Sequence, residues 1–166
     1  MRKAISYICF YAFFCLLQFF FGKYLSVNGI FPNFILIAVI YLGFTRGRMG
    51  AQTAGFAFGL TWDAFSTDVF GARTLMLTVI GYFAGMFNRQ FDKDQIAAQV
   101  AAIFFANIIY WAGFSAIYFI LPEGSGNYEP FAVTLTGTLK IAVTVIITPL
   151  VFWVLNFASA FSKRYL

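Results

Sequence analysis

Three charged side chains stand inside or beside apolar stretches of this sequence, where a charge is costly and therefore informative. Asp63 follows the stretch GFAFGLTW, Arg73 opens the next apolar stretch, and Lys140 lies inside the last one. A charged group in such surroundings must be hydrated, neutralised or paired. The chemistry to consider is therefore ion pairing, contact with a ligand or partner, and acid–base catalysis.

Asp63 has two interpretations. In the first, the carboxylate ties its helix to the following turn by pairing with Arg73 or by accepting hydrogen bonds from backbone N–H groups. In the second, the carboxylate faces a cavity or a partner helix. Asp68, a little further along, is predicted to cap the next helix at its N-terminus, where a negative charge is favoured.

Lys140 also leaves two possibilities open. Its apolar stretch is longer than the roughly 20 residues that a span needs, so the ammonium group can reach the outer interface by snorkelling. Alternatively, Lys140 is buried and pairs with Asp63 or with a carboxylate of a partner.

Catalysis has little support in the residue types. The chain contains no His, which excludes His-based acid–base and metal chemistry. Cys9 and Cys15 point in different directions on a helix, so we expect neither a disulfide nor a metal site. There is no Ser/Lys dyad at a plausible depth and no Walker-type loop. The sequence therefore predicts neither an enzyme nor a cofactor.

Small residues precede Asp63 at a regular spacing. Gly55, Gly59 and Asp63 recur every four residues and share one broad helix face, and Gly81 and Gly85 repeat the pattern in the next apolar stretch. Faces of this kind let two helix backbones approach closely in a membrane. We expect these positions, with Gly71 between them, to pack helices together or to contact a partner.

Composition indicates the environment of these elements. Of the 166 residues, 61% are hydrophobic and 10% are charged, well beyond the roughly 45–50% apolar content of a soluble domain. The sequence predicts an all-α integral membrane protein with a single polytopic domain over residues 1–166, surrounded by the lipid bilayer. The six expected spans cover about residues 4–22, 30–45, 49–66, 72–87, 96–121 and 131–160.

The basic residues predict how these spans are oriented. Six spans place both termini on one side, and that side receives eight of the basic residues against two on the other, so both ends are expected to be cytoplasmic. The net charge of +5 is then a consequence of topology, and no nucleic-acid partner is expected. Pro149 should kink the last span, with Thr144 or Thr148 bonding the carbonyls it frees. Gln99 and Asn107 should form hydrogen bonds between helices.

An ordered series of short motifs resembles the MreD family of bacterial rod shape-determining membrane proteins. The series covers about residues 30 to 87 and consists of Pro32-Asn33, the segment Gly59-Leu60-Thr61-Trp62-Asp63, Phe70-Gly71, and Gly81-Tyr82 followed by Gly85. Thr61 and Trp62 stand where the family more often has aliphatic residues, which could alter local packing.

The resemblance implies a non-enzymatic subunit of the cell-elongation machinery in the bacterial cytoplasmic (inner) membrane. It would bind MreC, a single-span protein, and through it link MreB filaments to the peptidoglycan synthases. The family is also similar in architecture to the S components of energy-coupling-factor transporters. The alternative function is therefore a transport subunit that binds a vitamin-sized molecule, although the modest loops offer few polar groups for such a pocket.

Overall fold

We describe the fold from a computed structural model of the chain. It describes the backbone of residues 2–24, 30–66, 69–87, 95–120 and 135–165, and the side chains of 9–20, 24, 30–66, 69–87, 95–120 and 137–157. The helices are α1 (Arg2–Tyr24), α2 (Phe34–Ala64), α3 (Ala72–Met86), α4 (Ile96–Ile120) and α5 (Leu135–Tyr165). The predicted cap at Asp68 lies outside the described residues.

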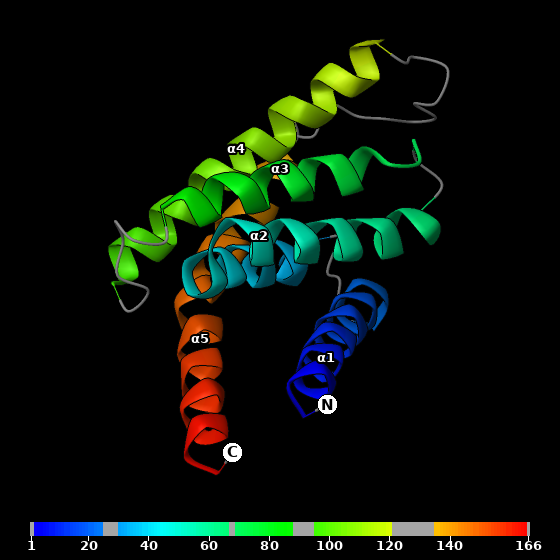
Figure 1. Ribbon diagram of the computed structural model, residues 1–166. Coiled ribbons are helices and arrows are strands. Elements are labelled where there is room, and N and C mark those ends of the chain that lie inside the picture. The colour runs from blue at the N-terminus through cyan, green and yellow to red at the C-terminus, as the bar shows by residue number, and fades with distance from the viewer. Residues whose placement is uncertain (1, 25–29, 67–68, 88–94, 121–134, 166) are drawn as a thin grey trace.

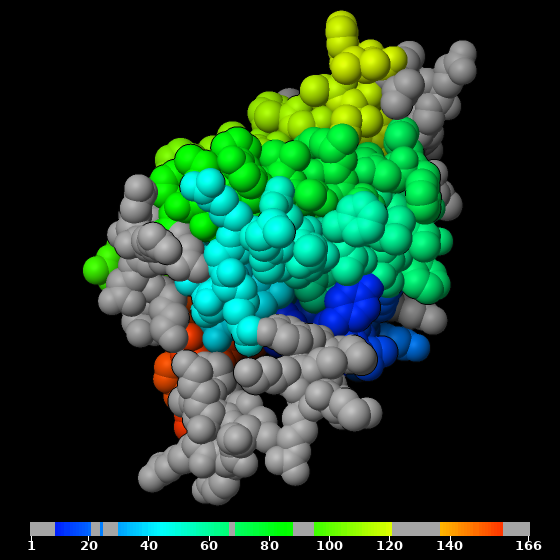
Figure 2. All heavy atoms as spheres, viewed as in Figure 1, coloured from blue at the N-terminus to red at the C-terminus, as the bar shows by residue number. Residues whose placement is uncertain are grey.

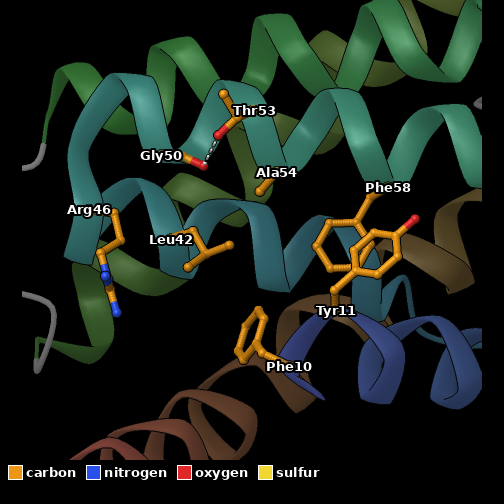
Figure 3. A pocket seen from close by; sticks show the side chains of 8 residues that line it. All are labelled: Phe10, Tyr11, Leu42, Arg46, Gly50, Thr53, Ala54 and Phe58. Atoms are coloured by element: carbon orange, nitrogen blue, oxygen red, sulfur yellow. Dashed lines mark hydrogen bonds between the residues drawn. The ribbon is translucent and has the colours of Figure 1, made fainter. Parts of the chain in front are cut away.

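The all-helical class is confirmed, but the described part of the chain has five helices rather than six. The second and third predicted spans belong to one element, α2, which is interrupted at Gly47 by a non-helical φ of 74° and ψ of −168°. A positive φ is inexpensive for glycine because it has no Cβ. Figure 3 shows that the chain turns back here, so that Leu42 and Arg46 lie on one arm of α2, and Gly50, Thr53 and Ala54 lie on the other.

The first arm of α2, residues 34–46, is the centre of the molecule. Asn33 caps its N-terminus by accepting a hydrogen bond from the N–H of Leu36 at 3.0 Å. Every side chain from Phe34 to Tyr41 is at most 6% exposed. The core that encloses this arm includes one side chain from each of α1, the second arm of α2 and α5, and two from each of α3 and α4: Phe14, Phe58, Phe152, Leu77, Ile80, Ile103 and Ala106.

The other helices are arranged around α2. In Figure 1, α3 lies beside α2 with α4 next to α3, while α1 and α5 extend to the end of the view where both termini lie. Figure 2 shows α2 and α3 as one continuous surface, with α1 against the side of α2 away from α3. The pair formed by α2 and α3 is therefore the body to which the remaining helices attach.

Hydropathy supports placement of this fold in a membrane. Three segments within the described residues are long and apolar enough to cross one by length and composition, namely Phe34–Ala64, Ile96–Ile120 and Gly137–Phe157, although the first is divided into two arms at Gly47. The apolar helices Cys9–Phe20 and Ala72–Met86 are shorter. The span windows of the second and third segments are 22% buried inside the protein, so most of their side chains are exposed or half-buried. An outward apolar surface of this extent is suited to lipid tails.

Two expectations about polar side chains within helices are wrong. Asn107 donates to the carbonyl of Ile103 in its own helix at 2.8 Å, rather than to a neighbouring helix. Thr144 and Thr148 donate to the carbonyls of Lys140 and Thr144, each at 2.7 Å, and not to the carbonyl four residues before Pro149. Each hydroxyl or amide group donates to a backbone carbonyl in the preceding turn of its own helix, because that carbonyl is the nearest available acceptor.

Candidate functional site

The second arm of α2 and α3 meet along a line of glycines. A Cβ on Gly55 would overlap the carbonyl group of Leu77, and a Cβ on Gly59 would overlap the backbone of Thr74. Both glycines are buried. The backbones of the two helices are thus in direct contact, which is the arrangement that small residues allow in membrane proteins.

The glycines of α3 complete the same line from the other side. A Cβ on Gly81 would lie 2.5 Å from the carbonyl oxygen of Ala51, and one on Gly85 would lie 2.5 Å from Cα of Arg48. On the first arm of α2, a Cβ on Gly43 would lie 2.7 Å from the Cβ of Ala84. Four of the predicted small residues, Gly55, Gly59, Gly81 and Gly85, therefore each meet the backbone of the opposite helix within this chain. Gly71 does not take part, because a Cβ placed there would meet nothing within 4 Å. We name the contact between the second arm of α2 and α3 the glycine seam.

Asp63 closes the glycine seam at the N-terminus of α3. The N-cap residue of α3 is Gly71, which has a φ of 91° and offers no side chain to its helix. Asp63 supplies the missing acceptor from α2: Oδ1 accepts from the N–H of Arg73 at 3.3 Å, and Oδ2 accepts from the N–H and the hydroxyl of Thr74 at 2.9 and 2.7 Å. The carboxylate thereby satisfies donors that a helix start leaves unpaired, and its charge is favoured there.

Arg73 gives the same carboxylate a counter-charge. Its Nη1 lies 3.8 Å from Asp63 Oδ1, with the Asp63 side chain fully buried and that of Arg73 15% exposed. The guanidinium also donates to the hydroxyl of Ser66. It lies 5.4 Å from the ring centroid of Trp62 and 5.7 Å from that of Phe114, at distances typical of cation–π contacts. These contacts favour the structural interpretation of Asp63, in which both predicted forms of the tie operate together.

Lys140 makes different contacts. It lies near the start of α5, where its side chain is half-buried and its Nζ lies 5.5 Å from the ring centroid of Phe31. The partners of Asp63 described above all belong to the start of α3 or to its N-terminal turn. The structure therefore brings Asp63 and Arg73 together and gives Lys140 an aromatic neighbour.

A second polar site, which sequence reasoning missed, joins α1 and α5 to the first arm of α2. Gln18, 3% exposed, accepts hydrogen bonds through Oε1 from the N–H groups of Phe34 and Ile35 at 2.8 and 3.4 Å. The N–H of Asn33 donates to the hydroxyl of Thr144 on α5 at 3.1 Å. The signal in the sequence was one amide within an otherwise apolar span, a feature that marks a buried polar contact but does not reveal its partners.

We expect the substitution Gln18→Met to lower the free energy of unfolding by about 1–3 kcal/mol, because the buried N–H of Ile35 loses its acceptor and that of Phe34 keeps only the carbonyl of Pro32. The matched control is Leu16→Met on the same helix, where the side chain is 70% exposed, with an expected change within about 0.5 kcal/mol. Thermal unfolding of both purified variants in detergent measures the difference. Equal stability of the two variants would contradict this role for Gln18.

The arrangement is better suited to holding helices than to chemistry. Both oxygens of Asp63 already accept hydrogen bonds, and the carboxylate is fully buried. Within the described residues, no group of three or more His, Cys, Asp or Glu side chains is placed to hold a metal ion.

Comparison with known proteins gives one result. The family model described as rod shape-determining protein MreD matches residues 2–161. No curated protein and no solved structure matches the sequence. The family match extends well beyond the motif series at residues 30 to 87 and includes α1, α4 and most of α5.

Proposed function

The chain belongs to the MreD family of rod shape-determining membrane proteins, and from this premise we propose that it is a non-enzymatic scaffold of the cell-elongation machinery. In this role it binds an MreC-like single-span protein and, through that protein, links MreB filaments to the peptidoglycan synthases. The proposal also includes six membrane crossings in the cytoplasmic membrane, with the two arms of α2 counted separately and both termini in the cytoplasm.

The glycine seam is the observation that carries the proposal. Its glycines bring the backbones of α2 and α3 into direct contact. Asp63, at the end of α2, accepts hydrogen bonds from the first N–H groups of α3 and so caps that helix. Such a pair is held by steric fit and by buried hydrogen bonds, so it offers a partner a rigid surface. A scaffold needs this property, whereas catalysis would need a carboxylate with free access to a substrate.

Because the glycine seam is closed inside the chain, a partner span must use another surface, and we assign it to the outer face of α4. Four exposed alanines lie on this helix in two pairs with a spacing of four residues, Ala97 with Ala101 and Ala112 with Ala116. Small residues at this spacing let a second helix approach closely in lipid.

The proposal is tested by purifying the tagged protein with an MreC-like protein from bacterial membranes in a mild detergent. We expect Ala112→Leu to lower recovery of the MreC-like protein at least about tenfold, the equivalent of ~1.4 kcal/mol, because the added side chain holds the partner helix away. The matched control is Ala142→Leu, an exposed alanine of α5, which should leave recovery unchanged.

The outcomes separate two failures. If the unsubstituted protein recovers no MreC-like partner, the scaffold function is wrong. If it recovers the partner and Ala112→Leu does so equally well, the assignment to α4 is wrong while the scaffold function stands. A stoichiometric vitamin-sized molecule or an ATPase module in the same preparation would favour the alternative, a transport subunit similar to the S components of energy-coupling-factor transporters.

A further inference from the structure

A groove separates α1 from the two arms of α2 (Figure 3). Its volume is about 370 Å³, and its walls are the apolar side chains of Phe10, Leu42, Ala54 and Phe58. It is distinct from the glycine seam, because α1 rather than α3 forms one side. The groove opens to the exterior of the protein and is lined mainly by carbon.

One end of the groove carries a positive charge. Arg46 lies there, exposed, beside the turn at Gly47. The stem of Arg46 lies directly over Gly50, where a Cβ would come within 2.6 Å of the Cβ of Arg46. The bare Gly50 therefore leaves room for the arginine at the rim. A guanidinium group has five N–H donors and is well suited to bind phosphate oxygens.

Two further polar side chains of the groove, Tyr11 and Thr53, are hydrogen-bonded within the protein. Tyr11, on the α1 side, donates to the carbonyl of Ala57 at 3.2 Å and contacts the hydroxyl of Thr61. The hydroxyl of Thr53 donates to backbone carbonyls of its own helix, 2.9 Å from that of Met49. The groove thus presents one cationic end and an apolar remainder.

We propose that this groove binds one anionic phospholipid, with the phosphate on Arg46 and one acyl chain against the apolar walls. This inference goes beyond the scaffold function. It agrees with the predicted topology, in which Arg46 and the turn at Gly47 lie at the cytoplasmic surface, where anionic lipids attract basic groups.

The size of the groove favours an acyl chain over a partner helix. Two turns of an α-helix, about 11 Å long and 10–12 Å across, occupy roughly 1,000 Å³. This is well above the cavity volume of about 370 Å³. An acyl chain is thinner than a helix and can occupy a groove of this volume along part of its length.

The test uses native mass spectrometry of the delipidated full chain after addition of phosphatidylglycerol or phosphatidylethanolamine with identical acyl chains. We expect about fivefold greater retention of phosphatidylglycerol, as about 1 kcal/mol per basic residue at an anionic surface implies. Arg46→Gln should abolish this preference, and Arg46→Lys should keep it because the charge is retained.

Two further variants make the test specific to this groove. Arg48→Gln removes a cation from the same turn, but the guanidinium of Arg48 lies over the ring of Tyr82 on α3, 5.6 Å from its centroid, so the preference should persist. Thr53→Trp fills the groove from an exposed position and should reduce retention of both lipids. Equal retention of the two lipids by the unsubstituted protein, an unchanged preference in Arg46→Gln, or unchanged retention in Thr53→Trp would each overturn the proposal.

Discussion

The substitution Gly59→Ala is expected to lower the free energy of unfolding by about 2 kcal/mol. The new methyl group would overlap the backbone of Thr74, which cannot move without separating α2 from α3. Overpacking of this kind costs up to about 3 kcal/mol, whereas the higher helix propensity of alanine relative to glycine stabilises the helix by about 1 kcal/mol. Thermal unfolding in detergent, followed by tryptophan fluorescence, measures the loss.

Gly113→Ala is the matched control for this prediction. It adds the same methyl group to a helix and removes the same glycine, but the atoms it would meet belong to the flexible side chain of Met76. A thioether side chain can take another rotamer at little cost. We therefore expect Gly113→Ala to be neutral or slightly stabilising. A loss of stability no greater at Gly59 than at Gly113 would mean that the glycine seam is not tightly packed.

The substitution Asp63→Ala is expected to destabilise the protein more, by about 3–5 kcal/mol, because breaking a buried charge pair leaves the partner charge uncompensated. It also removes the acceptor for the N–H groups of Arg73 and Thr74. Asp63→Asn retains one acceptor oxygen, so its free energy of unfolding should lie between those of the unsubstituted protein and Asp63→Ala. Unfolding free energies of the three proteins in the same detergent test this order, and an Asp63→Ala protein as stable as the unsubstituted one would show that Asp63 does not cap α3.

Two threonines of α3 provide a control for the hydrogen bonds of Asp63. Thr74 donates its hydroxyl to Asp63 at 2.7 Å, whereas Thr78, one turn later, donates to the carbonyl of Thr74 at 2.6 Å. Thr74→Val should therefore lose about 1.5–3 kcal/mol, as for a hydrogen bond to a charged group. Thr78→Val should lower the free energy of unfolding by less. In double variants, the effect of Thr78→Val should add to that of Asp63→Ala, whereas the effect of Thr74→Val should not.

The helical elements were predictable because their signals are local. Apolar runs and the basic turn at Arg46 and Arg48 marked the segments, and the predicted limits of 49–66 and 72–87 lie close to the second arm of α2 and to α3. The turn at Gly47 also falls between the predicted limits of 30–45 and 49–66, although the sequence does not show how closely the two arms of α2 pack. Hydropathy also did not distinguish the buried first arm from spans that face lipid, because both are uniformly apolar.

The candidate site was only partly predictable for a related reason. The four-residue spacing predicts that Gly55, Gly59 and Asp63 share a face, but it does not specify what that face meets. Arg73 could be predicted as the ion-pair partner of Asp63 because it lies close to it in the sequence. The backbone donors of α3 became visible only with the fold, as did the acceptors that Gln18 and Thr144 provide to the start of α2.

The turn at Gly47 has a consequence for how the protein is made. The first arm of α2 is about 20 Å long at 1.5 Å per residue, shorter than the roughly 30 Å hydrocarbon core, so it inserts more readily as a hairpin with the second arm than alone. When this hairpin leaves the ribosome, α4 and α5 have not been synthesised, and lipid must cover the arm that will become the centre of the protein. Its uniformly apolar sequence is compatible with both environments. The N–H of Asn33 can donate to the hydroxyl of Thr144 only after α5 has been inserted, which makes this hydrogen bond a marker of completed assembly.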